Sequence, residues 1–163
     1  MNLDKKPQKP NVSAGEKKPN KRHQARAYAM QAIFQWHFSE EAIEILLQEF
    51  IRDHLREEKN IDLDYFRALV FGTLKHNETI DESMTPFLDR PISQLNPVEL
   101  SVLRLAVFEL THRPEVPHAV VINEAIVLTK EFGSVEGYKF VNGVLNAMLP
   151  SIKSRNRTGS RAN

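Results

Sequence analysis

The chain has 163 residues, of which 41% are hydrophobic; it contains no cysteine, and its formal net charge is +1. The hydrophobic content is sufficient for a packed core in one domain, and the lack of cysteine excludes disulfides, thiolate metal ligands and cysteine nucleophiles. No apolar run approaches the ~20 residues that a membrane-spanning helix needs, and the first thirty residues lack the apolar stretch of a signal peptide. We therefore expect a cytoplasmic protein that does not enter a membrane.

The charge is distributed very unevenly along the chain. Residues 1–26 carry a net charge of +6, residues 27–150 a net charge of −9, and the segment after Pro150 a net charge of +4. Basic ends on an acidic body favour attraction to a polyanion such as nucleic acid, although charged tails that only keep a protein soluble give the same pattern. We expect a disordered basic tail over residues 1–20 and a second basic tail over residues 153–163.

Between the tails, apolar residues recur at helical spacing and no segment alternates as a strand does, so the sequence predicts an all-α fold. We expect helices at about His23–Phe38, Glu40–His54, Asp62–Leu88, Pro97–His112, Pro117–Phe132 and Ser134–Pro150. The clearest start is Asn96-Pro97, a capping residue followed by a proline in the first helical position. We further expect Gly72 to bend the third helix and Gly133 to end the fifth in the left-handed conformation.

One face of the first helix does not belong to its apolar stripe. Arg26, Met30 and Phe34 follow one another every four residues, so their side chains meet, and Lys21, Arg22 and His23 lie just before them. An aromatic ring on a basic helix face suits single-stranded nucleic acid, because cations neutralise phosphates and the ring stacks on an unpaired base. The alternative is that Phe34 packs beneath another helix and that Arg26 is a solvated charge.

The sequence gives little indication of catalysis. Its histidines are scattered, without a zinc-binding H-E-x-x-H pattern, a phosphate-binding glycine loop or a G-x-S-x-G nucleophile motif. We interpret His112 as a cation near helix carbonyls, not as a ligand. We expect no enzyme activity, no metal and no cofactor.

Several strings in order resemble the NusB family, over residues 22–152. They are Ala25-Arg26-x-x-Ala29-x-Gln31-Ala32-Ile33-Phe34-x-Trp36, Val102-Leu103-Arg104-Leu105-Ala106-x-Phe108-Glu109-Leu110, Val116-Pro117, Ile122-Asn123-Glu124-Ala125-Ile126 and Lys139-Phe140-Val141-Asn142-Gly143-Val144-Leu145-Asn146. The resemblance implies two packed helical subdomains, residues 21–91 and 92–152. It also implies a transcription antitermination factor that binds the boxA element of nascent RNA, notably from ribosomal RNA operons.

The resemblance also implies partners and site residues. The partners would be NusE, a small-subunit ribosomal protein, and the RNA polymerase antitermination complex; a homodimer stays open. The implied RNA-binding residues at the arginine-rich start of the first helix are Lys21, Arg22, His23 and Arg26, followed by the aromatic position Phe34 beside Met30. Glu99 corresponds to a position near the NusE-facing surface, although a role at the helix start explains it equally well.

The residues themselves suggest a second RNA contact at Lys139 and Phe140. They begin the last helix, where free amides and a cation can meet phosphate. The equal alternative for Phe140 is a place in the core. Two other functions remain open: an accessory RNA-binding domain in ribosomal RNA modification, and a helical protein–protein adaptor.

Overall fold

The computed structural model describes Pro7 and residues 20–162, and every regular element within this part of the chain is helical. The α-helices are α1 (Lys21–Ser39), α2 (Ile43–Phe50), α3 (Leu63–Lys75), α4 (Asn77–Met84), α5 (Pro97–His112), α6 (His118–Phe132) and α7 (Gly137–Ala162). A π-helical turn, Ile51–Leu55, continues α2, and two short 3-10 turns, Thr85–Phe87 and Ile92–Gln94, precede α5. The all-α class is confirmed. Apart from Pro7 and Asn20, the tail predicted over residues 1–20 lies outside the described residues.

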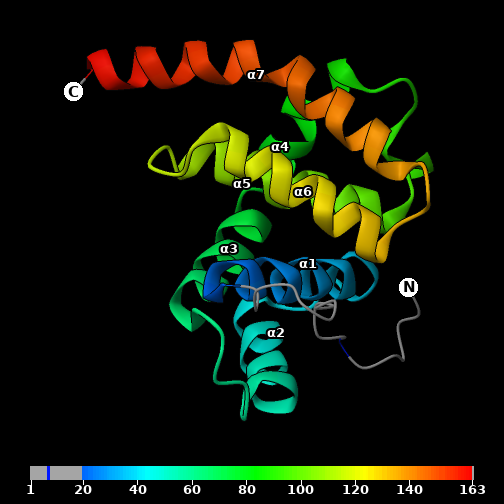
Figure 1. Cartoon of the computed structure of the whole chain (residues 1–163), viewed down its shortest axis with the longest axis vertical. Helices are drawn as coiled ribbons and strands as arrows, with labels where there is room; N and C mark the ends of the chain where they lie inside the picture. The colour runs from blue at the N-terminus through cyan, green and yellow to red at the C-terminus, as the bar shows by residue number, and fades with distance from the viewer. Residues whose placement is uncertain (1–6, 8–19, 163) are drawn as a thin grey trace, which may run out of the picture.

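Helix α5 is the centre of the molecule, and α1, α3, α4, α6 and α7 all pack against it (Figure 1). Every residue from Val98 to Leu110 is buried, so this helix has no solvent-facing stripe. Its start is as predicted: Asn96 Oδ1 accepts hydrogen bonds from the backbone N–H groups of Val98 at 2.9 Å and Glu99 at 3.2 Å. The structure does not test the division into two subdomains, which stays a prediction.

The prediction of a single long helix from Asp62 to Leu88 is wrong, because the chain forms two helices that meet at His76. Asp62 does cap α3, with its Oδ1 accepting from Tyr65 N–H at 3.0 Å. At the break, the Asn77 side-chain amide donates to the Leu74 carbonyl and the Thr79 hydroxyl donates to the His76 carbonyl. Side chains that bond nearby carbonyls compete with the helical backbone, which explains a break at this point.

Gly72 lies inside α3 and allows α3 and α5 to approach closely, while the bend expected at this glycine stays a prediction. A Cβ atom at this position would overlap the ring of Phe108 in α5. The role predicted for Gly133 is wrong, because this residue, which follows α6, has φ −97° and is extended, not left-handed. A Cβ there would come within 2.8 Å of the Thr129 carbonyl oxygen, so a close approach explains this glycine.

The sequence predicted that the last helix ends at Pro150. This is wrong, because α7 continues through Pro150 to Ala162. Figure 1 shows α7 changing direction part-way along, and a proline inside a helix is a common cause of such a bend, since it lacks an N–H donor. No helix in the described part of the chain has both the length and the apolar character needed to cross a membrane.

Candidate nucleic-acid interface

The first turn of α1 is exposed and basic. Lys21 and Arg22 begin the helix, no acidic residue lies in this turn, and Asn20 Oδ1 caps it by accepting from His23 N–H at 2.7 Å. A helix N-terminus carries about half a positive charge, so two cations there add to a positive potential that favours an anionic ligand. The Arg22 guanidinium carbon lies 4.2 Å from the centre of the Tyr65 ring, and its Nε is 3.9 Å from Asp62 Oδ2.

His23 faces α6 and already has a carboxylate partner. Its Nδ1 lies 2.6 Å from Glu124 Oε2, and both side chains are mostly buried. The hydrogen bond to Glu124 raises the pKa of His23 above its usual value, against the opposing effect of burial. The pair therefore holds the start of α1 against α6 and leaves His23 at the edge of the basic turn.

Arg26 is buried, so the prediction that it lies on an exposed basic face is wrong. Its Nε donates to Glu109 Oε1 at 2.7 Å and its Nη2 to Glu109 Oε2 at 3.0 Å, while the side chain is only 4% exposed. The Tyr65 hydroxyl donates to the same Glu109 Oε2 at 2.5 Å, and burial raises the pKa of Tyr65 to about 12. Arg26 therefore fixes α1 to α5 from within the molecule.

Met30 and Phe34 are also buried, with 0% and 5% of their surface exposed, so the predicted exposed ring on α1 does not exist. The physical reason is that α1 packs against α3 on one face and against α5 on another. A helix with two buried faces has no wide polar side, so the face opposite its apolar stripe still lies inside the core.

The exposed aromatic residue of α1 is Phe38, which was not predicted from the sequence. Half of its surface is accessible, and its ring lies edge-to-face on Phe34, with ring centres 5.1 Å apart. Phe38 follows Phe34 by four residues, so extending the line of Arg26, Met30 and Phe34 by one turn would have found it.

The start of α7 forms a second group with a cation above an aromatic ring. Phe140 is partly buried, and the Arg90 guanidinium carbon lies 5.2 Å from its ring centre. Lys139 is well exposed, with its Nζ 2.7 Å from Glu136 Oε2 in a surface pair of little energetic weight. The structure does not bring this group next to the start of α1: the two helix starts lie on opposite sides of the view in Figure 1.

Glu99 lies beneath the start of α7. A Cβ atom built on Gly137 would come within 2.9 Å of the Glu99 carboxyl carbon, so this glycine leaves room for the carboxylate. Burial raises the pKa of Glu99, and the charge of nearby Arg90 partly opposes the shift. Only 9% of Glu99 is exposed, so the carboxylate has little surface for the partner contact predicted for it.

The described residues include no group of three or more histidine, aspartate or glutamate side chains that could hold a metal ion. His112, which we expected to be a cation, lies with its ring centre 4.4 Å from that of His76. Burial and the neighbouring His76 lower the pKa of His112, which favours its neutral form at pH 7, so the expected cation is not supported.

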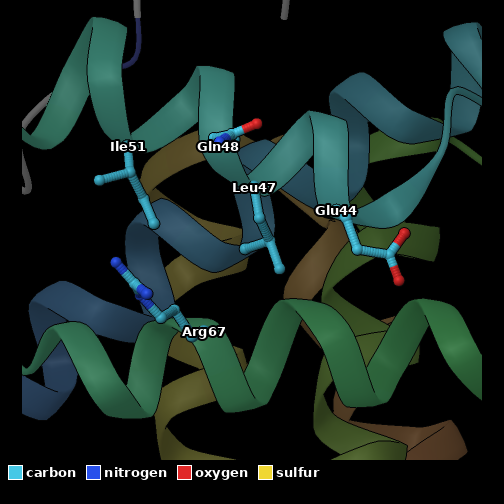
Figure 2. Close-up of a pocket in the computed structure, with 5 residues that line it drawn as sticks. All are labelled: Glu44, Leu47, Gln48, Ile51 and Arg67. Atoms are coloured by element: carbon cyan, nitrogen blue, oxygen red, sulfur yellow. The ribbon is translucent and has the colours of Figure 1, made fainter.

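A surface hollow of about 460 Å³ lies between α2 with its π-helical turn and α3 (Figure 2). Leu47 and Ile51 form its apolar side, with Glu44 towards one end and Arg67 on α3. The predicted second helix, Glu40–His54, is here divided into α2 and the π-helical turn. None of the predicted site residues lines this hollow.

Comparison with known proteins gives consistent matches over most of the chain. Residues 23–150 match the sequence model of the NusB family. The transcription antitermination protein NusB of Coxiella burnetii is 50% identical over 132 residues, which cover 81% of this chain and 94% of the relative. The chain belongs to the NusB family. The NusB protein of Idiomarina loihiensis is 45% identical over 136 residues, covering 83% of this chain and 96% of that protein.

Solved NusB structures have the same all-helical fold. NusB of T. maritima superposes with a TM-score of 0.69 at 30% identity, covering 83% of this chain and 93% of the other. A NusB chain crystallised with NusE and double-stranded RNA gives a TM-score of 0.69 at 30% identity, covering 78% and 94%. The family resemblance inferred from the sequence strings is thus confirmed, and the family is one of antitermination factors, not of enzymes. Lys153 and the residues after it lie beyond the match to the family model.

Proposed function

We propose that this chain is an antitermination factor that binds boxA RNA of nascent transcripts, notably of ribosomal RNA operons. In this proposal it acts together with NusE and joins the RNA polymerase antitermination complex. The observation that carries the proposal is the match to a NusB chain whose solved complex contains NusE and RNA, with 94% of that chain covered. A homodimer stays a separate prediction, which sedimentation of the free protein would test.

The direct RNA contacts that we propose are Lys21 and Arg22 at the start of α1, with His23 at their edge. These cations stand at the positive end of a helix without an acidic neighbour in the same turn, an arrangement that favours phosphate. Lys139 and Phe140 would supply a second contact at the start of α7. The ring of Phe140 is only partly buried, which leaves part of it for stacking or for the edge of a base.

Arg26, Met30 and Phe34 are not direct contacts in this proposal, because all three are buried. Arg26 is instead a positioning residue, since its bidentate pair with Glu109 holds the helix that presents Lys21 and Arg22. Glu99 would support the binding of NusE indirectly, by holding the start of α7 in place.

The test is binding of boxA RNA and of a scrambled RNA, each with and without NusE, at two salt concentrations. Charge reversal at Lys21 and Arg22 should weaken boxA binding at low salt and reduce the slope of log affinity against log salt by about 0.7 or more per lost contact. The matched control reverses Arg67 and Lys75, two exposed cations of α3, which gives the same change in net charge elsewhere.

The control variant should bind boxA RNA as the wild-type chain does, and both variants should keep their helical content. Equal losses in the two variants would mean that only net charge attracts RNA. Binding of NusE without any preference for boxA RNA would replace the proposal with the helical adaptor function.

A further inference from the structure

A strip of cations continues from the start of α1 across the connection between α5 and α6. The guanidinium carbon of Arg113, just after α5, lies 5.1 Å from the centre of the Tyr65 ring, the same ring that Arg22 approaches to 4.2 Å. Both arginines therefore meet at one tyrosine, although they come from segments far apart in the sequence. The facing carboxylates are Asp62, beside Arg22, and Glu115, beside Arg113.

These carboxylates do not fully neutralise the strip. Arg22 Nε lies 3.9 Å from Asp62 Oδ2, with both side chains more than one third exposed. Arg113 Nε is buried and lies 2.9 Å from Glu115 Oε1 without making a hydrogen bond, while 33% of the Arg113 side chain and 55% of the Glu115 side chain are exposed. Solvent screens such pairs strongly, so the exposed parts of both arginines remain available to phosphate.

The strip then reaches the C-terminal part of α7. A surface hollow of about 410 Å³ is lined by Pro114 and His118 from the α5–α6 side and by Lys153 and Asn156 from α7. The Asn156 side-chain amide donates to the Leu110 carbonyl at 3.4 Å, and Ile152 is buried, which holds this part of α7 against the end of α5. In Figure 1 the start of α1, the α5–α6 connection and the end of α7 lie on the same side of the view.

Lys153 and Arg155 are the exposed cations of α7 beyond Pro150 whose side chains the structure describes. Arg155 is turned about 200° around the helix axis from Lys153, since successive helical residues are about 100° apart. Both residues lie beyond the segment that matches the family model.

We propose that this strip, running from Arg22 through Arg113 to Lys153, is a second RNA-binding surface for the single-stranded backbone that flanks the boxA element. The inference rests on the proposed function, because it requires RNA bound at the start of α1. The strip offers lysine and arginine side chains, which suit contacts to phosphate. Such contacts position a strand but do not read its sequence. The surface would therefore lengthen the bound RNA and raise its affinity, with no preference for the flanking bases.

An acidic protein segment is the other polyanion that such a surface could hold. RNA is favoured because the strip is continuous with the proposed RNA contacts at Arg22, through the ring of Tyr65. The hollow at Lys153 is also wide and open, without the enclosed apolar pocket in which the anchor residue of a protein partner is usually held.

The test uses the full-length chain and two RNAs: boxA alone, and boxA with single-stranded oligouridine on both sides. Lys153→Gln should weaken binding of the longer RNA roughly fivefold at 0.1 M salt. The reason is that one lost phosphate contact changes the slope of log affinity against log salt concentration by ~0.7. It should leave binding of boxA alone unchanged. The matched control is Arg155→Gln, which removes the same charge two residues away on another side of α7 and should change neither affinity.

Equal affinity of the wild-type chain for the two RNAs, or equal losses in both variants, would overturn the second surface. Binding of a polyglutamate peptide that is lost in Lys153→Gln, with binding of the longer RNA unchanged, would overturn it in favour of an acidic protein partner. Failure of the proposed function gives a different result, since the wild-type chain would then not distinguish boxA from scrambled RNA even without flanks.

Discussion

Arg26 and Glu109 lie 83 residues apart and form a bidentate ion pair inside the molecule, with N–O distances of 2.7 and 3.0 Å. The Tyr65 hydroxyl donates a third hydrogen bond to the same carboxylate. Side chains from α1, α3 and α5 thus satisfy one another's hydrogen-bonding groups where water has little access. The basic start of α1 is held in place by this cluster, although no member of the cluster is itself exposed.

Replacing one partner of this pair should destabilise the fold strongly. Arg26→Ala and Glu109→Ala should each lower the free energy of unfolding by about 3–5 kcal/mol, because each leaves a buried charge without its partner. Denaturant unfolding of both single variants measures this loss. The double variant Arg26→Met, Glu109→Leu should recover much of the stability, and a double variant as unstable as the sum of the single changes would contradict this account.

Phe34→Ala should act on stability. The ring is 5% exposed, and truncation of a buried phenylalanine costs about 3–5 kcal/mol. Phe38→Ala is the matched control, since it removes the same ring from an exposed position one turn later, and it should cost much less. If thermal unfolding showed equal losses, or if Phe34→Ala changed only RNA affinity, the buried position of Phe34 would be wrong.

His23 should stabilise the protein more in acid than in base. Its pKa is raised by Glu124, so its contribution is complete below about pH 6.5, the ordinary value, and is lost as pH rises through the raised value. We expect the difference in Tm between wild type and His23→Gln to shrink as pH increases from 5.5 to 8.5. His37→Gln supplies an opposite control, because burial lowers the pKa of His37 and its contribution is lost as pH falls.

Two glycines should respond in opposite directions to alanine. Gly143→Ala should stabilise the protein by about 0.5–1 kcal/mol, because a Cβ there meets nothing within 4 Å and glycine is a poor helix former. Gly72→Ala should cost about 1–3 kcal/mol or more, because its Cβ would overlap Phe108. Thermal unfolding of the two variants checks both signs, and a loss at Gly143 would indicate a close packing contact there.

Local chemistry made several parts of the fold predictable. The caps at Asn96 and Asp62 and the bounds of α5 and α6 follow from residue type and spacing, and the structure confirms them. The break at His76 was missed because the apolar stripe continues across it, while competing side-chain hydrogen bonds interrupt the backbone. The continuation through Pro150 was missed because proline usually ends a helix.

The candidate site was less predictable, because a helical wheel shows only one helix at a time. It places Arg26 and Phe34 on one face but does not include the second neighbour that covers this face. Long-range partners decide the outcome: Glu109 lies 83 residues after Arg26, and Glu124 lies 101 residues after His23. The exposed cations Lys21 and Arg22 could be recognised in advance, since residues at a capped helix start have no preceding turn to cover them.

The central helix α5 carries two charges of opposite sign, Arg104 and Glu109, which lie five residues apart. Arg104 pairs with Asp81 of α4 at 2.8 and 2.9 Å, and Glu109 pairs with Arg26 of α1. Rotating α5 by a single residue, about 100°, would withdraw both charges from their partners at once and leave them in an apolar interior. The two pairs therefore fix the rotation of α5 about its own axis. The almost continuous apolar surface of α5 would by itself specify this rotation poorly.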